Sequence, residues 1–190
     1  GASNPRHLAA DLLSQAEHDK MASAVLVTDS MELALRVRNQ LEVQIPLLPR
    51  QEIARASIDR NGKIIVAKDN LLLAIDIANE IAPEHLELCV DNPFDYLDRI
   101  RNAGSVFMGK YCPEALGDYF AGPNHTLPTG GTARFSSPLS VDDFVKKSQF
   151  TYYTRAALER VVGKVAYFAG REGLDAHARS AVIRFEEKAK

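Results

Sequence analysis

Hydrophobic residues in the first 110 positions follow two different spacings along the chain. Short, largely apolar runs alternate with longer stretches in which apolar residues recur at helical spacing. Runs typical of strands occupy 24–28, 63–67, 86–90 and 104–109. Helical spacing or capping residues predict helices at 5–18, 31–44, 52–56, 71–81 and 93–100. This alternation predicts an α/β fold, half of a doubly wound, Rossmann-like parallel sheet with flanking crossover helices.

Specific residues mark the predicted helix boundaries. Asp29 and Ser30 stand before the second helix, and Asp69 and Asn70 stand before the helix at 71–81, where their side chains are expected to cap free backbone N–H groups. Pro83 cannot continue a helix, so it is predicted to end the helix at 71–81. The segment after Pro83 is therefore expected to turn at once from helix into strand.

The chain changes character after residue 109. Residues 110–138 show little periodicity but hold many polar and turn residues, interleaved with aromatic side chains that argue against disorder. Long irregular segments of this kind usually serve function, so an ordered active-site loop is predicted here. Gly130 and Gly131 lack the lysine and spacing of a phosphate loop, and no GxGxxG motif follows a strand, so these glycines predict only tight turns.

The C-terminal segment returns to helical patterning. We predict a helical or mixed segment at 141–150, a helix at 155–170 capped by Gly170, and a last helix at 174–189. The apolar stripe of the last helix has little chain left to pack against, which favours contact with another subunit. The expected domains are 1–138, a Rossmann-like α/β domain containing the active-site loop 110–138, and 139–190, a C-terminal helical dimerisation region.

Composition and charge exclude several classes of partner. The net charge of -2 and the isoelectric point near 6.2 give no electrostatic reason to expect nucleic acid or a membrane surface. Cys89 and Cys112 fit neither a disulfide framework nor a CxxC metal motif, which favours a reducing compartment. No apolar run approaches the roughly 20 residues that span a bilayer, and no signal-peptide pattern precedes the first helix. We therefore expect a soluble, cytoplasmic protein.

Two short stretches hold candidate chemistry. Glu84 and His85 lie at the predicted helix-to-strand corner, where an imidazole that titrates near neutrality stands beside a possible second acid or base. Gln15 and His18 are three residues apart, which places both on one face of the first helix. Adjacent Glu and His residues are also common in ordinary loops, and Gln15 with His18 also fits a solvated helix end. Both interpretations therefore stay open at this point.

A metal site is a further possibility that spacing alone does not decide. The histidines are His7, His18, His85, His125 and His177. The sequence contains neither an HExxH motif nor a Cys/His cluster, so ligands would have to come from distant segments. Such a set of nitrogen and oxygen donors could consist of Gln15, His18, Asp118 and His177.

Taken together, these stretches resemble the C-terminal part of histidinol dehydrogenase. The matching segments are 11–18 (DLLSQAEH), 82–86 (APEHL), 103–107 (AGSVF), 117–119 (GDY), 122–125 (GPNH), 127–129 (LPT) and 174–177 (LDAH). They occur in the family's order, at close to its spacing, and cover the chain from about Leu8 onward. Each segment alone is common, but their joint occurrence is specific.

The resemblance implies a zinc- and NAD-dependent enzyme. The family oxidises L-histidinol through L-histidinal to L-histidine in histidine biosynthesis, using two NAD molecules and one zinc ion. By resemblance, Gln15, His18 and Asp118 would bind zinc together with His177 from the other subunit of a homodimer. Because the zinc anchors the substrate, these four ligands would also bind substrate.

The resemblance also implies individual roles for other residues. His85 would be the general base of both oxidations and would contact substrate, and Glu84 would activate the water that adds at the aldehyde stage. His125 and Glu172 would contact substrate. An alcohol oxidation needs a group that accepts the hydroxyl proton as hydride leaves, and a neutral imidazole near pH 7 suits this role.

One departure from the family bears on activity. The family's chains are more than twice as long, and the NAD-binding residues belong to the preceding half, so no cofactor-binding residue is expected in this chain. The parallel sheet is expected to be incomplete for the same reason. The alternative is a non-catalytic module that dimerises or binds metal without turnover. A metallohydrolase is a third interpretation, but no local metal motif supports it.

Overall fold

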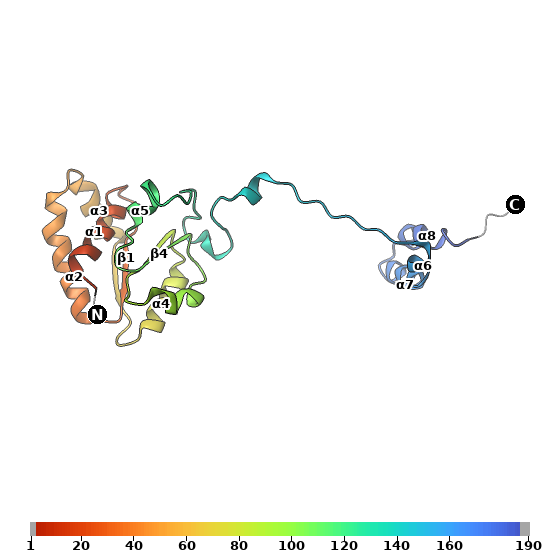
Figure 1. Cartoon of the computed structure of the whole chain (residues 1–190), viewed down its shortest axis with the longest axis horizontal. Coiled ribbons are helices and arrows are strands. Elements are labelled where there is room, and N and C mark those ends of the chain that lie inside the picture. The colour runs from red at the N-terminus through yellow and green to blue at the C-terminus, as the bar shows by residue number, and fades with distance from the viewer. Residues whose placement is uncertain (1–2, 187–190) are drawn as a thin grey trace. The chain divides into compact units, whose positions relative to one another are not determined.

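A computed structural model of the chain describes residues 3–186 (Figure 1). The chain divides into two compact units, Gly1–Phe144 and Val145–Lys190, and each is described by itself. The predicted domain boundary after residue 138 falls in the irregular segment that closes the first unit. Among the described residues, none of the helices combines the length and hydropathy needed to cross a membrane.

The first unit is built on short parallel strands. β1 (Val25–Thr28) pairs in parallel with β2 (Lys63–Val66), and β3 (His85–Leu88) pairs in parallel with β4 (Ser105–Met108). The two pairs form separate two-stranded sheets. The predicted α/β fold with an incomplete parallel sheet is therefore confirmed.

Helices surround these strands (Figure 1). The α-helices are α1 (Pro5–Ala16), α2 (Met31–Gln44), α3 (Gln51–Asn61), α4 (Leu71–Ile81) and α5 (Glu114–Tyr119). Short 3-10 helices occur at η1 (Ile45–Leu47), η2 (Pro93–Arg99), η3 (Thr132–Arg134) and η4 (Val141–Phe144). The main apolar core forms where α1 packs on α2 and α3, and its most enclosed members include Ala9, Val37 and Ala54, each with 0% exposure.

Side chains close the helix ends as the sequence predicts. The Ser30 and Asn70 side-chain oxygens accept hydrogen bonds from the backbone N–H groups of Leu33 and Leu73, which confirms both predicted caps. At its other end α4 stops at Ala82, which adopts a left-handed conformation with φ of 52° immediately before Pro83. This turn sends the chain directly into β3.

The predicted loop at 110–138 contains more regular structure than expected. α5 and η3 both lie within it, so the prediction of an irregular segment is wrong in these places. α5 has only six residues and includes Gly117, which is too short and too weak a pattern to give helical periodicity. Gly130 and Gly131 have φ of 59° and 82°, which confirms that they let the backbone turn tightly.

The second unit holds three short helices, α6 (Arg155–Glu159), α7 (Val162–Arg171) and α8 (Asp175–Val182). The predicted helix at 155–170 is thus split, at a point where β-branched valines precede Gly163 and lower helix propensity. Gly170 lies inside α7 and is not its cap, which is Glu172, followed by Gly173 with φ of 73°. The last helix is shorter than the predicted 174–189, whose final residues lie outside the described range.

The segment predicted as helical or mixed at 141–150 is helical only in η4. Ser140 caps it, because its hydroxyl oxygen accepts a hydrogen bond from the Asp142 backbone N–H. Residues 145–150 have no regular structure, and their side chains are exposed, so no packing surface stabilises a longer helix there.

Asn79 joins α4 to the segment that leads into β4. Its side chain is 1% exposed. Its amide donates to the Arg99 carbonyl at 2.9 Å, and its oxygen accepts from the backbone N–H groups of Arg101 at 2.7 Å and Asn102 at 3.2 Å. This side chain therefore fixes the entry into the strand that lies beside β3.

Replacing Asn79 by alanine is expected to lower the free energy of unfolding by about 2–4 kcal/mol, because buried polar groups lose their partners. Denaturant unfolding followed by circular dichroism measures this change. The control is Asp76→Ala in the same helix, whose 64%-exposed carboxylate pairs with Arg101 and should contribute less than about 1 kcal/mol. Equal losses in the two variants would contradict the structural role of Asn79.

Candidate functional site

The backbone around Glu84 and His85 is held closely by the neighbouring strand. The Gly104 N–H donates to the Pro83 carbonyl at 3.0 Å, and the Ser105 N–H donates to the Glu84 carbonyl at 2.8 Å. A Cβ atom on Gly104 would lie 2.6 Å from the Glu84 carbonyl oxygen, so only glycine allows this approach. The predicted helix-to-strand corner is therefore rigid.

His85 is the first residue of β3 and lies between two other rings. Its imidazole stacks on that of His125 with a centroid distance of 5.7 Å and an interplanar angle of 10°, and it is tilted against Phe107 at 5.9 Å. Its Nε2 atom is buried and has no hydrogen-bond partner in the described residues. A buried polar atom without a partner is unusual, and it leaves this ring nitrogen available to a ligand atom.

Burial also sets the charge of His85. Desolvation lowers the pKa of this imidazole below its ordinary value, and the nearby carboxylates of Glu84 and Asp118 oppose the shift only in part. His85 is therefore neutral near pH 7, with a free ring nitrogen that can accept a proton.

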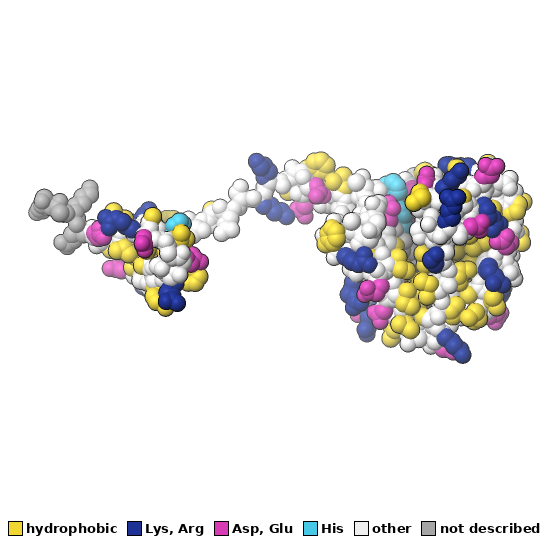
Figure 2. Space-filling model, turned by 180° about the vertical axis from the view of Figure 1, so that it is seen from behind, with side chains coloured by type: hydrophobic (Ala, Val, Ile, Leu, Met, Phe, Trp, Pro, Cys, Tyr) yellow, Lys and Arg dark blue, Asp and Glu magenta, His cyan; other side chains and the backbone are white. Residues whose placement is uncertain are grey.

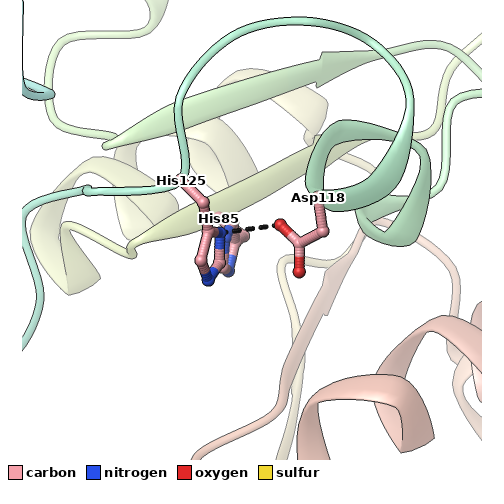
Figure 3. A group of neighbouring side chains, drawn as sticks. All are labelled: His85, Asp118 and His125. Atoms are coloured by element: carbon pink, nitrogen blue, oxygen red, sulfur yellow. Dashed lines mark ion pairs between the residues drawn. The ribbon is translucent and has the colours of Figure 1, made fainter.

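Asp118 and His125 complete a compact group with His85 (Figure 3). The Asp118 Oδ1 atom lies 2.7 Å from the His125 Nδ1 atom, and one donor atom from each of the three side chains lies within 4.8 Å of the others. The Asp118 side chain is 14% exposed, whereas that of His125 is 58% exposed. The structure thus brings together His85, Asp118 and His125, which the sequence places in three separate segments.

Gln15 and His18 lie near the end of α1. The helix stops at Ala16, so His18 lies in the following turn and not on the helical face predicted for it. Gln15 is half-buried and His18 is exposed. His18 lies close enough to His85 for its charge to lower the pKa of His85. The turn that follows α1 therefore lies near His85.

Glu172 and His177 belong to the second unit. Both are exposed, and they line a hollow of about 520 Å³ together with Lys164, Val165, Phe168 and Ala169. The predicted site residues are thus divided between the two units of the chain.

Glu114 is a buried site residue that the sequence analysis missed. It is 6% exposed at the start of α5, where its Oε2 atom lies 3.3 Å from the Ser14 hydroxyl of α1. Burial, with a hydrogen bond to Asp118, raises the pKa of Glu114 to about 7. The sequence could have indicated Glu114 only if α5 had been predicted as a helix. Glu114 and Asp118 are four residues apart, so they face each other on that helix.

A second group of acidic side chains lies beside a cavity of about 310 Å³. Asp11, Glu87 and Cys89 place one donor atom each within 4.8 Å of the others, and all three line this cavity. Burial is the main cause that raises the pKa of Glu87 to about 7 and that of Cys89 to about 12. The Glu87 carboxyl is hydrogen-bonded to Asp11 and accepts from the Glu114 backbone N–H at 2.8 Å, so hydrogen bonds already satisfy it.

The fold and site define an α/β protein in which a neutral imidazole lies beside carboxylate and nitrogen donors, a combination found in metal-dependent enzymes. A family model described as histidinol dehydrogenase matches residues 1–185. The chain belongs to the histidinol dehydrogenase family, as its resemblance to these proteins led us to expect.

Individual relatives agree with this assignment. The chain is 56% identical over 187 residues to histidinol dehydrogenase from Syntrophotalea carbinolica and 57% identical over 185 residues to that from Bacillus cereus, covering 98% and 97% of the chain. The crystal structure of histidinol dehydrogenase from Elizabethkingia anophelis matches 96% of the chain with a TM-score of 0.87 and 38% identity. The chain spans about 43% of the two curated relatives and 42% of the solved chain.

The raised pKa of Glu87 predicts how stability depends on pH. Glu87 titrates near 7 in the folded chain but near 4.5 when unfolded, so its contribution to stability is fully present below about pH 4.5 and is lost as the pH rises through about 7. We expect the midpoint of thermal unfolding, measured with a chelator present, to fall between pH 5 and pH 8, and Glu87→Gln to reduce that fall.

The control for this measurement is Glu42→Gln. Glu42 is exposed and hydrogen-bonded to Arg55, which lowers its pKa, so it stays ionised throughout this pH range. This variant should keep the wild-type slope. A Glu87→Gln variant with the wild-type slope would show that Glu87 does not titrate in this range.

Proposed function

We propose that this chain is the zinc- and substrate-binding part of an enzyme that oxidises L-histidinol through L-histidinal to L-histidine with NAD. The observation that carries the proposal is the buried, neutral His85 with its free Nε2 atom beside Asp118 and His125. Membership of the histidinol dehydrogenase family supports the same reaction. We assign NAD binding to parts of the longer relatives that this chain does not cover.

His85 would accept the hydroxyl proton in each oxidation. Its ring is held by stacking on His125 and by contact with Phe107, so its orientation does not depend on the substrate. Glu84 precedes it in the chain and would take a proton from the water that adds at the aldehyde stage. His125 and Glu172 would contact the substrate, and His85 would do so through its free nitrogen.

The donor chemistry of the site fits zinc. Zinc in catalytic sites takes imidazole nitrogen and carboxylate oxygen while leaving positions open to substrate. We assign Gln15, His18 and Asp118 as ligands, with His177 supplied by a second copy of the chain. When bound, zinc would orient the substrate through its amino and imidazole nitrogens, which also makes the four ligands substrate-binding residues.

A homodimer fits the surface of the second unit. Its described residues include only two buried hydrophobic side chains, Ala169 and Ala181, whereas Tyr167 and Phe168 are 70% and 66% exposed. Hydrophobic side chains are visible across its surface (Figure 2). A surface of this kind is stabilised by burial against a partner, and a second copy would also bring His177 to the site.

A non-catalytic module that dimerises or binds metal is the second candidate, because the chain spans only about 43% of its curated relatives. The two candidates are separated by mixing the chain with the preceding part of the Bacillus cereus relative and assaying NAD reduction with histidinol and zinc. We expect activity only in the mixture. Absence of activity in a mixture that forms a stable complex would favour the module.

Asp118→Ala is expected to weaken zinc binding by more than about 100-fold, because the loss of groups that merely orient ligands already costs about 10- to 100-fold. Competition with a chromophoric chelator measures the affinity, and NAD reduction in the complemented mixture should be lost in parallel. Asp76→Ala, which removes an exposed carboxylate from α4, should change neither quantity. Normal zinc affinity in Asp118→Ala would remove this residue from the ligand set.

His85→Ala is expected to separate zinc binding from catalysis. The variant should bind zinc like the wild type, because His85 is not an assigned ligand, but should lower turnover by about 10²- to 10⁴-fold at neutral pH. His7→Ala provides a matched loss of an imidazole from α1, outside the assigned site. Unchanged turnover in His85→Ala would exclude this residue as the base.

A further inference from the structure

His125 lies on a loop that is closed by its own hydrogen bonds. The Asn124 side-chain oxygen accepts from the Thr126 backbone N–H at 2.8 Å, and its amide donates to the Leu139 carbonyl. The Leu139 backbone N–H donates to the Thr126 carbonyl at 2.9 Å. These bonds join the two ends of residues 124–139, which we call the His125 loop. Because its ends are joined, a contact that moves this loop also moves the His125 ring.

The ring of His125 depends on such support because it is not buried. Its side chain is 58% exposed, yet it stacks on His85 with a centroid distance of 5.7 Å (Figure 3). Its Nδ1 atom lies 2.7 Å from Asp118 Oδ1, which holds one ring atom but does not by itself fix the plane of the ring. The stack therefore depends on where the loop places the His125 backbone.

Packing places one point of the loop against the helix-to-strand corner. A Cβ atom on Gly104 would lie 3.2 Å from Pro128 Cδ, and the Gly104 N–H donates to the Pro83 carbonyl. Pro128 thus lies against the backbone that holds the corner. A single contact of this kind leaves the loop able to pivot about it, so a second attachment is needed.

Arg134 supplies this second attachment at the C-terminal end of α4. Its guanidinium donates to the Gly131 carbonyl within the loop at 3.0 Å and to the Glu80 carbonyl in the last turn of α4. The last carbonyl groups of a helix have no helical partner, and a nearby cation stabilises them. α4 carries no basic residue in its own last turn, so Arg134 supplies that charge from 54 positions away in sequence.

Gly131 leaves room for the guanidinium. It has φ of 82°, and a Cβ atom on it would lie 2.5 Å from Arg134 Nη1. Glu80 lies just before the corner at which α4 leads into His85. One arginine side chain therefore reaches from the loop that carries His125 to the helix that leads into His85.

We propose that Arg134 is a positioning residue that anchors the His125 loop to the end of α4 and so keeps the His125 ring stacked on His85. The consequence for substrate rests on the proposed function, in which both histidines contact it, whereas the consequence for the stack does not. Arginine suits this role because its planar guanidinium donates to two carbonyl groups in a fixed geometry.

The test compares Arg134→Met with Arg134→Lys in the 190-residue chain. Methionine keeps an unbranched side chain but donates no hydrogen bond, whereas lysine keeps the charge and can donate to the Glu80 carbonyl. Arg101→Met is the matched control, because it removes an arginine that is 65% exposed and pairs with Asp76 of the same helix, α4.

The nuclear Overhauser effect between the ring protons of His85 and His125 measures the stack. It is recorded in the metal-free chain at a fixed neutral pH, and His125→Asn identifies the His125 resonances. A residue with only a general structural role would lower the free energy of unfolding in denaturant without weakening this effect in the folded chain. The two measurements therefore separate positioning from stability.

Arg134→Met is expected to lose most of the effect between the two rings, Arg134→Lys to keep more of it, and Arg101→Met to keep all of it. In the complemented mixture, the KM for histidinol should rise about tenfold in Arg134→Met, because a hydrogen bond from a charged group is worth at least about that factor. We expect kcat to change less, since the proposed base, His85, stays on β3.

An effect in Arg134→Met as strong as in the wild type would overturn the inference. An equal loss in Arg101→Met would also overturn it, because any exposed arginine beside α4 would then act alike. If Arg134→Met does not fold, as judged by circular dichroism, Arg134→Lys is compared with Arg101→Lys, and equal effects in these two variants would overturn the inference. A weakened effect with an unchanged KM would support the anchor and reject the assigned contact of His125 with substrate.

Discussion

The structure of the site depends on hydrogen bonds to carboxyl groups that have been largely removed from water. Glu87 of β3 accepts from the Glu114 backbone N–H at the start of α5, and the Glu114 carboxyl accepts from the Ser14 hydroxyl of α1. Burying such groups costs free energy unless each finds a partner. Ser14 and Glu114 are 100 positions apart in sequence, so these contacts join distant segments. The same contacts therefore hold α1, β3 and α5 together.

The environment that favours protonated carboxyls also favours a neutral histidine. Desolvation destabilises whichever form carries charge, so it raises the pKa of Glu87 and Glu114 and lowers that of His85. No dedicated partner is needed to keep His85 uncharged, and its Nε2 atom stays free. The neutral imidazole with a free nitrogen that the proposed base requires is thus a direct product of burial at the start of β3.

Features that depend on neighbouring residues could be predicted from the sequence, whereas those that depend on tertiary contacts could not. The caps at Ser30 and Asn70 and the strand and helix order are local, and the structure has them as expected. α5 is too short to show periodicity, and Glu114 becomes a site residue only through that helix and through Ser14, 100 positions away in sequence. The split of the helix at 155–170 likewise follows from weak propensity without a stabilising core.

The second unit raises a different physical problem, because its short helices pack mainly on one another and its described residues bury few large apolar side chains. Burial of Ala169 and Ala181 removes little apolar surface from water, whereas the larger rings of Tyr167 and Phe168 stay exposed. Helices of 5, 10 and 8 residues are individually marginal in water. We propose that burial against a second copy of the chain stabilises them, and the hollow lined by Phe168, Glu172 and His177 belongs to the surface of this unit. Assembly and completion of the proposed site would then be one event, since the same burial that stabilises α7 and α8 would fix Glu172 and His177 for substrate and zinc.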